Sequence, residues 1–288
     1  MPMNTYADIS GYVQTIFEDA MFVARETSIM APLVQGFDDA QGDNPRTNSN
    51  YGTVTMQSLS ETDDMASQAF TPSTYNTLTP GEAGGQVFLV DRRIDNDPFG
   101  ARADAAQELG ASMAAKIETD LIGDFTTLTG GTVGAGGSPT SWGMIFAAET
   151  ILRAKLAPGR LRCVMSPYQW FNLGTAVNVV GAGPARNAPN FQDRVNDQGQ
   201  LASGYVFSHG NIDFYTSAWI ASGTAVTAAM FAAPAIALDT RRAPRLEPER
   251  DASRRGWELN VSAVYAHGKW RPEWGVQILS SGTVPNGF

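Results

Sequence analysis

Residues 97–123 read DPFGARADAAQELGASMAAKIETDLIG and predict the longest helix of the chain. Asp97 is suited to cap a helix N-terminus, and Pro98 suits the first helical position, where its missing N–H costs nothing. One apolar stripe follows the helical period and consists of Phe99, Ala103, Ala106, Gly110, Met113, Ile117 and Leu121. Some 25 residues would form a rod of roughly 40 Å, so we expect a long spine around which the rest of the chain folds.

The segments before the spine are polar and extended. Residues 10–27 predict an amphipathic helix, and residues 36–50 predict an extended arm. In residues 51–93, two β-like runs at 53–59 and 86–94 flank a long polar insert. An insert of this length is usually functional or disordered, and a two-stranded excursion is not stable alone in water. We therefore expect a neighbouring subunit to support it.

The region after the spine predicts a compact α/β unit. The glycine-rich stretch 130–137 is expected to be a flexible connection, and Ser138-Pro139 to begin a helix that ends near Ala154. Residues 161–165 predict a short buried strand. Ser166-Pro167 caps a further expected helix, which spans residues 168–173 and is closed by Gly174. Residues 175–200 are rich in Gly, Asn and Pro and predict a long loop.

The C-terminal third predicts strands. Strand-like runs occur at residues 204–207, 212–215, 224–231, 235–238 and 275–279. Residues 257–265 alternate apolar and polar side chains with the period of two that a half-buried strand shows. The heavily charged residues 241–255 are expected to form an exposed hairpin. Together with the spine and the α/β unit, these strands indicate the α+β fold class.

Composition excludes several classes of protein. The 288 residues carry a net charge of −9, which disfavours non-specific binding of nucleic acid. One cysteine and two histidines argue against a disulfide framework and a zinc site. The uncharged residues 217–238 could match a bilayer in length, but Gly223 and Pro234 interrupt them. We read them as strand, turn and strand, and expect neither a membrane span nor a signal peptide.

No catalytic pattern stands out. The glycine run lacks the Lys-Ser/Thr of a phosphate-binding loop, and no Gly-x-Ser-x-Gly motif occurs. Cys163 lies in an apolar run and is expected to be a core residue. Asp63 and Asp64 are adjacent, which suits a solvated loop better than a weak cation site. We therefore expect no enzyme activity, no cofactor and no metal.

The order of these parts resembles the major capsid proteins of tailed bacteriophages, which have the Hong Kong ninety-seven type of fold. Three stretches carry the resemblance: the spine with residues 114–120, the Val-Met-Ser-Pro-Tyr-Gln-Trp motif at residues 164–170, and residues 257–276 near the C-terminus. The resemblance implies an N-terminal arm (1–50), an E-loop (51–95), the spine of a P-domain (96–130), an A-domain (131–236) and returning P-domain strands (237–288).

The resemblance also implies a function and a set of partners. Such a chain would assemble with itself into pentamers and hexamers of an icosahedral head that encloses double-stranded DNA without sequence-specific binding. It would reside in the virion after assembly in the host cytoplasm, with a separate scaffolding protein, a portal and decoration proteins as partners. Some members cross-link through an E-loop lysine. Residues 51–93 contain no lysine, so we expect no such bond here.

Charged residues supply candidate contacts between subunits. The acidic candidates are Asp63 and Asp64, and the basic candidates on the C-terminal hairpin are Arg241, Arg242, Arg245, Arg250, Arg254 and Arg255. Arginine suits such pairs because its planar guanidinium matches a carboxylate. The alternative is that these side chains simply face solvent. Two other functions stay open: a nanocompartment shell of the encapsulin type, which shares this fold, and a soluble hydrolase with an unrecognised site.

Overall fold

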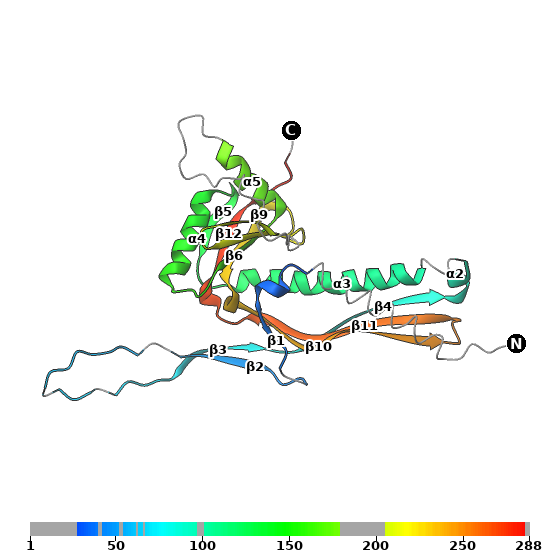
Figure 1. Cartoon of the computed structure of the whole chain (residues 1–288), viewed down its shortest axis with the longest axis horizontal. Coiled ribbons are helices and arrows are strands. Elements are labelled where there is room, and N and C mark those ends of the chain that lie inside the picture. Colours follow the sequence, from blue (N-terminus) through cyan, green and yellow to red (C-terminus); the bar gives the residue numbers. More distant parts are fainter. Residues whose placement is uncertain are drawn as a thin grey trace.

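The computed structural model describes residues 28–39, 42–51, 54–61, 63–65, 67–96, 101–178 and 205–285. Its class is α+β, as expected from the sequence. A long helix lies along one sheet, a second sheet with its helices forms a separate layer beyond one end of that helix, and a thin hairpin extends away from both (Figure 1). The amphipathic helix expected at residues 10–27 lies outside the described residues.

The first sheet has four strands in the order β1-β10-β11-β4. These strands are β1 (Gln35–Phe37), β10 (Ile236–Asp251), β11 (Gly256–Lys269) and β4 (Gly81–Val90). β10 and β11 pair antiparallel in one long hairpin, whose turn is at residues 252–255. The charged residues 241–255 were expected to form an exposed hairpin by themselves, but residues 241–251 continue the strand that begins at Ile236, and Leu246 within them is buried. The alternating pattern is confirmed in β11, where Leu259, Val261 and Ala263 are buried between half-buried neighbours.

The spine is helix α3 (Ala101–Gly123), which confirms the predicted helix and its end. It packs on the first sheet through Ala105, Leu109 and Met113, which join Leu259 of β11 in one apolar cluster. Leu109 and Met113 supply most of the apolar surface of this contact. The predicted start of the spine lies outside the described residues.

The chain reaches the spine through a short helix that was not predicted. This helix, α2 (Asp91–Asn96), follows β4 directly. The β-like run at residues 86–94 is therefore a strand only as far as Val90. That strand also pairs with β11 in the body of the protein, so it is not the returning half of the excursion.

The second sheet has six strands in the order β5-β12-β9-β6-β8-β7. The strands are β5 (Thr132–Pro139), β12 (Gly275–Gly282), β9 (Gly223–Ala232), β6 (Leu161–Met165), β8 (Ile212–Thr216) and β7 (Tyr205–His209). β6 has a neighbour on each side, as its unbroken apolar run predicts. The final strand was expected among the returning strands beside residues 257–265, but β12 pairs with β9 and β5 instead.

Two helices cover this sheet. α4 (Trp142–Ala154) begins three residues later than expected, because the side chain of Ser141 caps it by accepting the N–H of Met144. α5 (Pro167–Asn178) does not end at Gly174 but continues for four more residues. Most of the expected loop at residues 175–200 lies outside the described residues.

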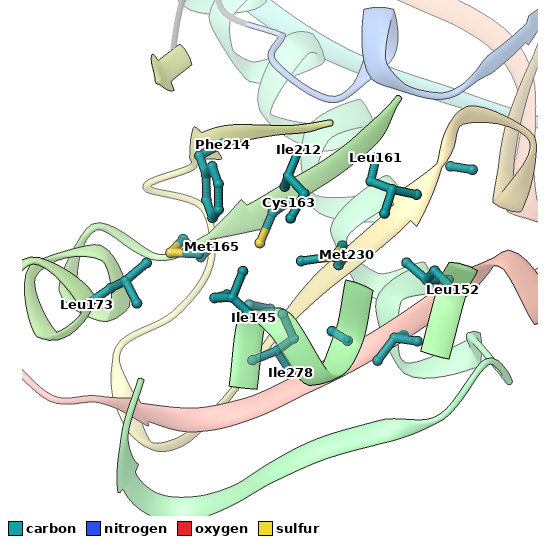
Figure 2. Packing of buried hydrophobic residues seen from close by; sticks show 14 residues of the cluster. Ile145, Leu152, Leu161, Cys163, Met165, Leu173, Ile212, Phe214, Met230 and Ile278 are labelled. Atoms are coloured by element: carbon teal, nitrogen blue, oxygen red, sulfur yellow. The ribbon is translucent and has the colours of Figure 1, made fainter. Parts of the chain in front are cut away.

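The core of this layer is assembled from both helices and the central strands. Figure 2 shows Ile145 of α4 and Ile278 of β12 below Cys163 of β6, with Met165 of β6 to one side and Leu152 of α4 to the other. All five side chains are fully buried. Cys163 is thus a core residue, as predicted, and burial raises the pKa of its thiol.

The glycine-rich stretch is a strand and not a flexible connection. β5 pairs in parallel with β12 at one edge of the six-stranded sheet. Gly134 has φ +87, and a Cβ there would collide with the carbonyl oxygen of Leu279. A side chain at Gly136 would press on Ala225. The glycines therefore permit close backbone packing, which the sequence alone did not distinguish from flexibility.

The excursion before the spine is a two-stranded hairpin built from different residues than predicted. β2 (Arg46–Tyr51) pairs antiparallel with β3 (Pro72–Leu78). The strand predicted at residues 53–59 is wrong, because Val54 to Leu59 form no strand. We call residues 46–78 the E-loop hairpin.

The remaining elements are short 3₁₀ turns that connect the layers: η1 (Ala31–Leu33), η2 (Asp124–Thr127), η3 (Ala233–Ala235) and η4 (Pro272–Trp274). The uncharged residues 217–238 form a turn, the strand β9, η3 and the start of β10, much as read from the sequence. Among the described residues, no helix is both long and apolar enough to cross a membrane.

Gly134→Ala tests whether β5 is an ordered strand. We expect the variant to lose about 2 kcal/mol or more in its free energy of unfolding, because φ is positive and the added Cβ meets the backbone of β12. Urea unfolding of the unassembled subunit measures this loss. Gly143→Ala in helix α4, where the nearest atom is 3.7 Å away, is the matched control and should be neutral or stabilising. If both variants had the same free energy of unfolding, residues 130–137 would be better described as a flexible connection than as a strand.

Candidate assembly interface

The outer half of the E-loop hairpin carries exposed apolar side chains. We call residues 54–71 the hairpin tip, and every described residue in it is exposed. Met56 is 88% exposed and Met65 is 77% exposed, and Val54, Leu59 and Phe70 are also exposed apolar residues. The hairpin extends away from both sheets, so these side chains lie far from the cores of the body (Figure 1). Clustered exposed apolar residues are typical of a surface that another molecule covers.

Few hydrogen bonds hold the tip together. The side-chain amide of Gln68 accepts the backbone N–H of Thr55 at 3.0 Å and donates to its carbonyl at 2.7 Å, much as a strand partner would. At the far end, Asp63 Oδ2 accepts the N–H of Ser60 at 2.9 Å in a local turn. This bond lowers the pKa of Asp63. Asp63 and Asp64 therefore sit at the extremity of the hairpin, exposed to solvent.

The root of the hairpin, in contrast, is fixed to the body by polar contacts. Asp239 on β10 is fully buried, and its Oδ2 accepts a hydrogen bond from Arg46 Nε at 2.9 Å. The same oxygen accepts from Arg241 Nη2 at 2.8 Å. Arg46 also pairs with the exposed Asp39 and lies 4.4 Å from the ring centre of Phe37. A buried carboxylate costs much free energy unless it is paired, and here two guanidinium groups pair it.

Two asparagines fix both strands of the hairpin to one carbonyl. Asn48 of β2 and Asn76 of β3 face each other across the ladder. Their side chains donate to the carbonyl oxygen of Trp270 at 3.1 and 3.0 Å. Leu78, at the end of β3, is buried against Ala237 and Ala266. The root thus has both polar and apolar anchors on the body, whereas every described residue of the tip is exposed.

Five of the six candidate arginines already have acidic partners within the chain. Arg241 pairs with Asp239, Arg242 with Glu82, Arg245 with Glu247, Arg250 with Asp91, and Arg254 with Asp251 and Glu258. Arg250 holds Asp91 with two bonds, of 2.7 and 2.8 Å. The side chain of Arg241 is only 4% exposed. Arg255 is exposed and has no ion pair within the part of the chain that the structure describes.

A buried glutamate connects the spine to the start of the described chain. Glu118 of α3 is fully buried, and its Oε2 accepts the N–H groups of Ile29 and Met30 at 3.1 and 2.8 Å. Its Oε1 accepts the hydroxyl of Ser217 at 3.1 Å. Burial raises the pKa of Glu118 even though three donors face the carboxylate. The contact holds Ile29 and Met30, near the start of the described residues, on the spine.

A second polar cluster joins the end of the spine to β11. His267 Nδ1 lies 2.9 Å from Asp124 Oδ2, and its Nε2 lies 3.8 Å from Asp120. Tyr265 donates to Asp120 at 2.6 Å, and Lys116 pairs with the other oxygen of Asp120 at 2.5 Å. The hydrogen bond to Asp124 raises the pKa of His267 above the ordinary 6.5, against the opposing effect of burial.

These contacts are the functional geometry that sequence reasoning missed. Asp239 and Glu118 each follow an apolar residue, but charged residues lie within two positions of both, so no sequence signal marked them as buried. Their partners lie far away in sequence, 193 residues in the case of Arg46 and Asp239. Neither cluster forms a catalytic set. Among the described residues, no group of three or more His, Cys, Asp or Glu side chains is placed to hold a metal ion.

Comparison with known proteins identifies the family. Residues 74–278, more than half of the chain, match the family described as "Phage capsid protein". No curated protein matches the chain.

Solved structures with the same fold include the capsid of cyanophage Pam1, with 10% identity, a TM-score of 0.66 and coverage of 90% of this chain and 93% of that one. The capsid of Ralstonia phage GP4 has 14% identity, a TM-score of 0.64 and 89% coverage of both chains. A virus-like particle from Pyrococcus furiosus has 9% identity, a TM-score of 0.61 and coverage of 93% and 99%.

The His267 cluster predicts a pH-dependent contribution to stability. A raised folded-state pKa means that the imidazolium is favoured by folding, so its contribution is complete below the unfolded pKa near 6.5 and is lost as the pH rises through the folded value. We expect His267→Gln to destabilise the subunit more at pH 5.5 than at pH 9, as measured by urea unfolding. His209→Gln, a histidine packed against Trp142 without a carboxylate partner in the described chain, is the control. An equal loss for His267→Gln at both pH values would contradict the assignment.

Proposed function

We propose that this chain, which belongs to the phage capsid protein family, assembles into the pentamers and hexamers of an icosahedral phage head that encloses double-stranded DNA. Its family places it in the shell of the virion as the major capsid protein, a structural role rather than an enzymatic one. The observation that carries the proposal is the E-loop hairpin, which is anchored at its root and exposes Met56, Leu59 and Met65 at its tip.

The tip would be covered by a neighbouring subunit, on its spine and four-stranded sheet. A two-stranded ribbon gains little stability from its own pairing, and each fully buried methionine or leucine contributes about 1.5–3 kcal/mol. Contacts that run from one subunit's tip to the next subunit's body are head-to-tail, and such contacts close into rings. The same geometry repeated five or six times yields the two kinds of capsomer.

Other segments would complete the contacts. The N-terminal arm, directed by Glu118 at its base, would pack under a neighbouring subunit. The loop expected at residues 175–200, whose first four residues belong to helix α5, would meet its symmetry copies at the five- and six-fold axes. The acidic net charge of −9 suits a shell that encloses DNA without gripping it. A separate scaffolding protein, a portal and decoration proteins would act with it in the host cytoplasm.

Among the candidate residues, the exposed ones are best suited to form ion pairs between subunits. Asp63 and Asp64 at the tip are exposed and acidic, and Arg255 is exposed without an ion pair in the described chain. The side chains of Arg245 and Arg254 are 46% and 66% exposed and could exchange partners on assembly. Arg241 is buried on Asp239 and is less suited to such a contact.

The encapsulin-type shell is the second candidate, because the fold is also that of a virus-like particle from Pyrococcus furiosus. The family match favours a phage head over this alternative and over a soluble hydrolase. An enzyme that copurified with the particles would favour an encapsulin. Particles that stay empty until phage packaging proteins and DNA are supplied would favour a head.

Negative-stain electron microscopy of the purified chain tests both the proposed assembly and the role of the hairpin tip in it. We expect shells, tubes or rings from the wild-type chain, and none from the triple variant Met56→Ser, Leu59→Ser, Met65→Ser. The subunit itself should stay folded, with a free energy of unfolding within about 0.5 kcal/mol of wild type, because all three side chains are exposed.

Leu156→Ser serves as the matched control, since Leu156 is an apolar residue with 85% exposure on the body rather than on the hairpin. It should leave assembly intact. A wild-type chain that stayed a small monodisperse monomer would refute the proposed function, and a triple variant that built normal shells would refute the role of the tip.

A further inference from the structure

We infer that Arg46, Asn48 and Asn76, with their acceptors Asp239 and the Trp270 carbonyl, set the angle at which the E-loop hairpin leaves the body and thereby the curvature of the shell. We call these residues the root clamp. The inference rests on the proposed function for its second half, the effect on the shell. The first half concerns a single subunit and stands on the geometry of the root.

The ion pair between Arg46 and Asp239 connects the hairpin to the body. Asp239 Oδ2 accepts from Arg241 at 2.8 and 3.1 Å, which already compensates the buried carboxylate within β10. The bond from Arg46 at 2.9 Å is additional, and it is the one that comes from the hairpin. Because Asp239 is fully buried, solvent and salt screen this bond weakly.

The asparagine pair restricts rotation. A single contact leaves a hairpin free to swing about it, but Asn48 and Asn76 attach the two strands separately to one carbonyl. Together with Arg46 they give three attachment points on β2 and β3. Arg241 also donates to the carbonyl oxygen of Asn44 at 3.0 Å, which holds the residues just before the hairpin on β10.

The length of the hairpin makes its angle consequential. Some 15 residues separate Arg46 from the turn at Glu61, so the extended arm spans up to about 50 Å. A rotation of about 10° at the root would displace the tip by roughly 9 Å, more than twice the distance of an apolar contact. The tip can therefore meet a fixed surface on a neighbour only if the root is held to a few degrees.

Distances between spin labels test the clamp in the full-length subunit. Labels are attached at Thr71→Cys, the residue just before β3, and at Ala147→Cys, on the exposed face of α4. Cys163 is fully buried and stays unlabelled. Labelled chains are diluted into unlabelled ones, so that the measurement reports one subunit whether or not it has assembled.

Arg46→Gln and Asn48→Ala are the two test variants, and each leaves the buried acceptor with its other donor. Thr71 lies about 23 Å from the root, so we expect each variant to widen or shift the distance distribution by about 4 Å, the effect of a rotation of about 10°. Arg153→Gln is the control, because it removes an exposed arginine paired on helix α4. It should leave the wild-type distribution unchanged.

The particles formed by the same variants test the link to curvature. Wild type and Arg153→Gln should give one narrow range of diameters, and Arg46→Gln and Asn48→Ala a broad range or open sheets. Unaltered label distances in both test variants would overturn the clamp. Altered distances with wild-type diameters would overturn its effect on the shell. If wild type formed no particles, the proposed function would fail, while the label distances would still decide the clamp.

Discussion

The E-loop hairpin cannot be completed by the chain that carries it. Its strands have only each other as partners, and its outer half exposes methionine and leucine side chains that no other described part of the body covers. Water is a poor environment for such a surface, and a two-stranded ribbon has too few contacts to offset the entropy of ordering it. We propose that a second subunit covers this surface, which would make assembly part of how this sequence reaches its final structure.

The two sheets and the spine form a packed body that supports the E-loop hairpin. The spine packs on one sheet through Ala105, Leu109 and Met113, and its far end meets the second sheet near Phe125 and Phe231. Buried polar residues appear where extended segments leave this support: Glu118 at the base of the N-terminal arm and Asp239 at the base of the hairpin. A buried carboxylate is a costly way to gain stability. Its directional hydrogen bonds, however, can fix the angle at which the bonded segment leaves the subunit.

The sequence predicted what short-range patterns control. The helix α3, the alternating strand β11 and the buried strand β6 each depend on patterns within a few turns or residues, and all three elements are confirmed. The face by which α3 packs on the sheet was predicted less well, because Ala105 and Leu109 lie outside the predicted stripe. The position of a strand in a sheet depends on partners that are distant in the sequence. For this reason β12 was assigned to the wrong sheet, and the glycine-rich β5 was not predicted as a strand. The hairpin strands were missed because β2 is polar, and its pairing with β3 across 20 residues leaves no periodic signal. The root contacts join residues up to 222 apart.

Hydrogen exchange of the backbone amides in residues 54–71 tests the central claim most directly, compared between unassembled subunits and assembled particles of the same chain. The account predicts rapid exchange in the subunit and strong protection in the particle, with β6 protected in both. Slow exchange of these amides in a compact, isolated subunit would show that the chain completes its own hairpin, and would contradict the account.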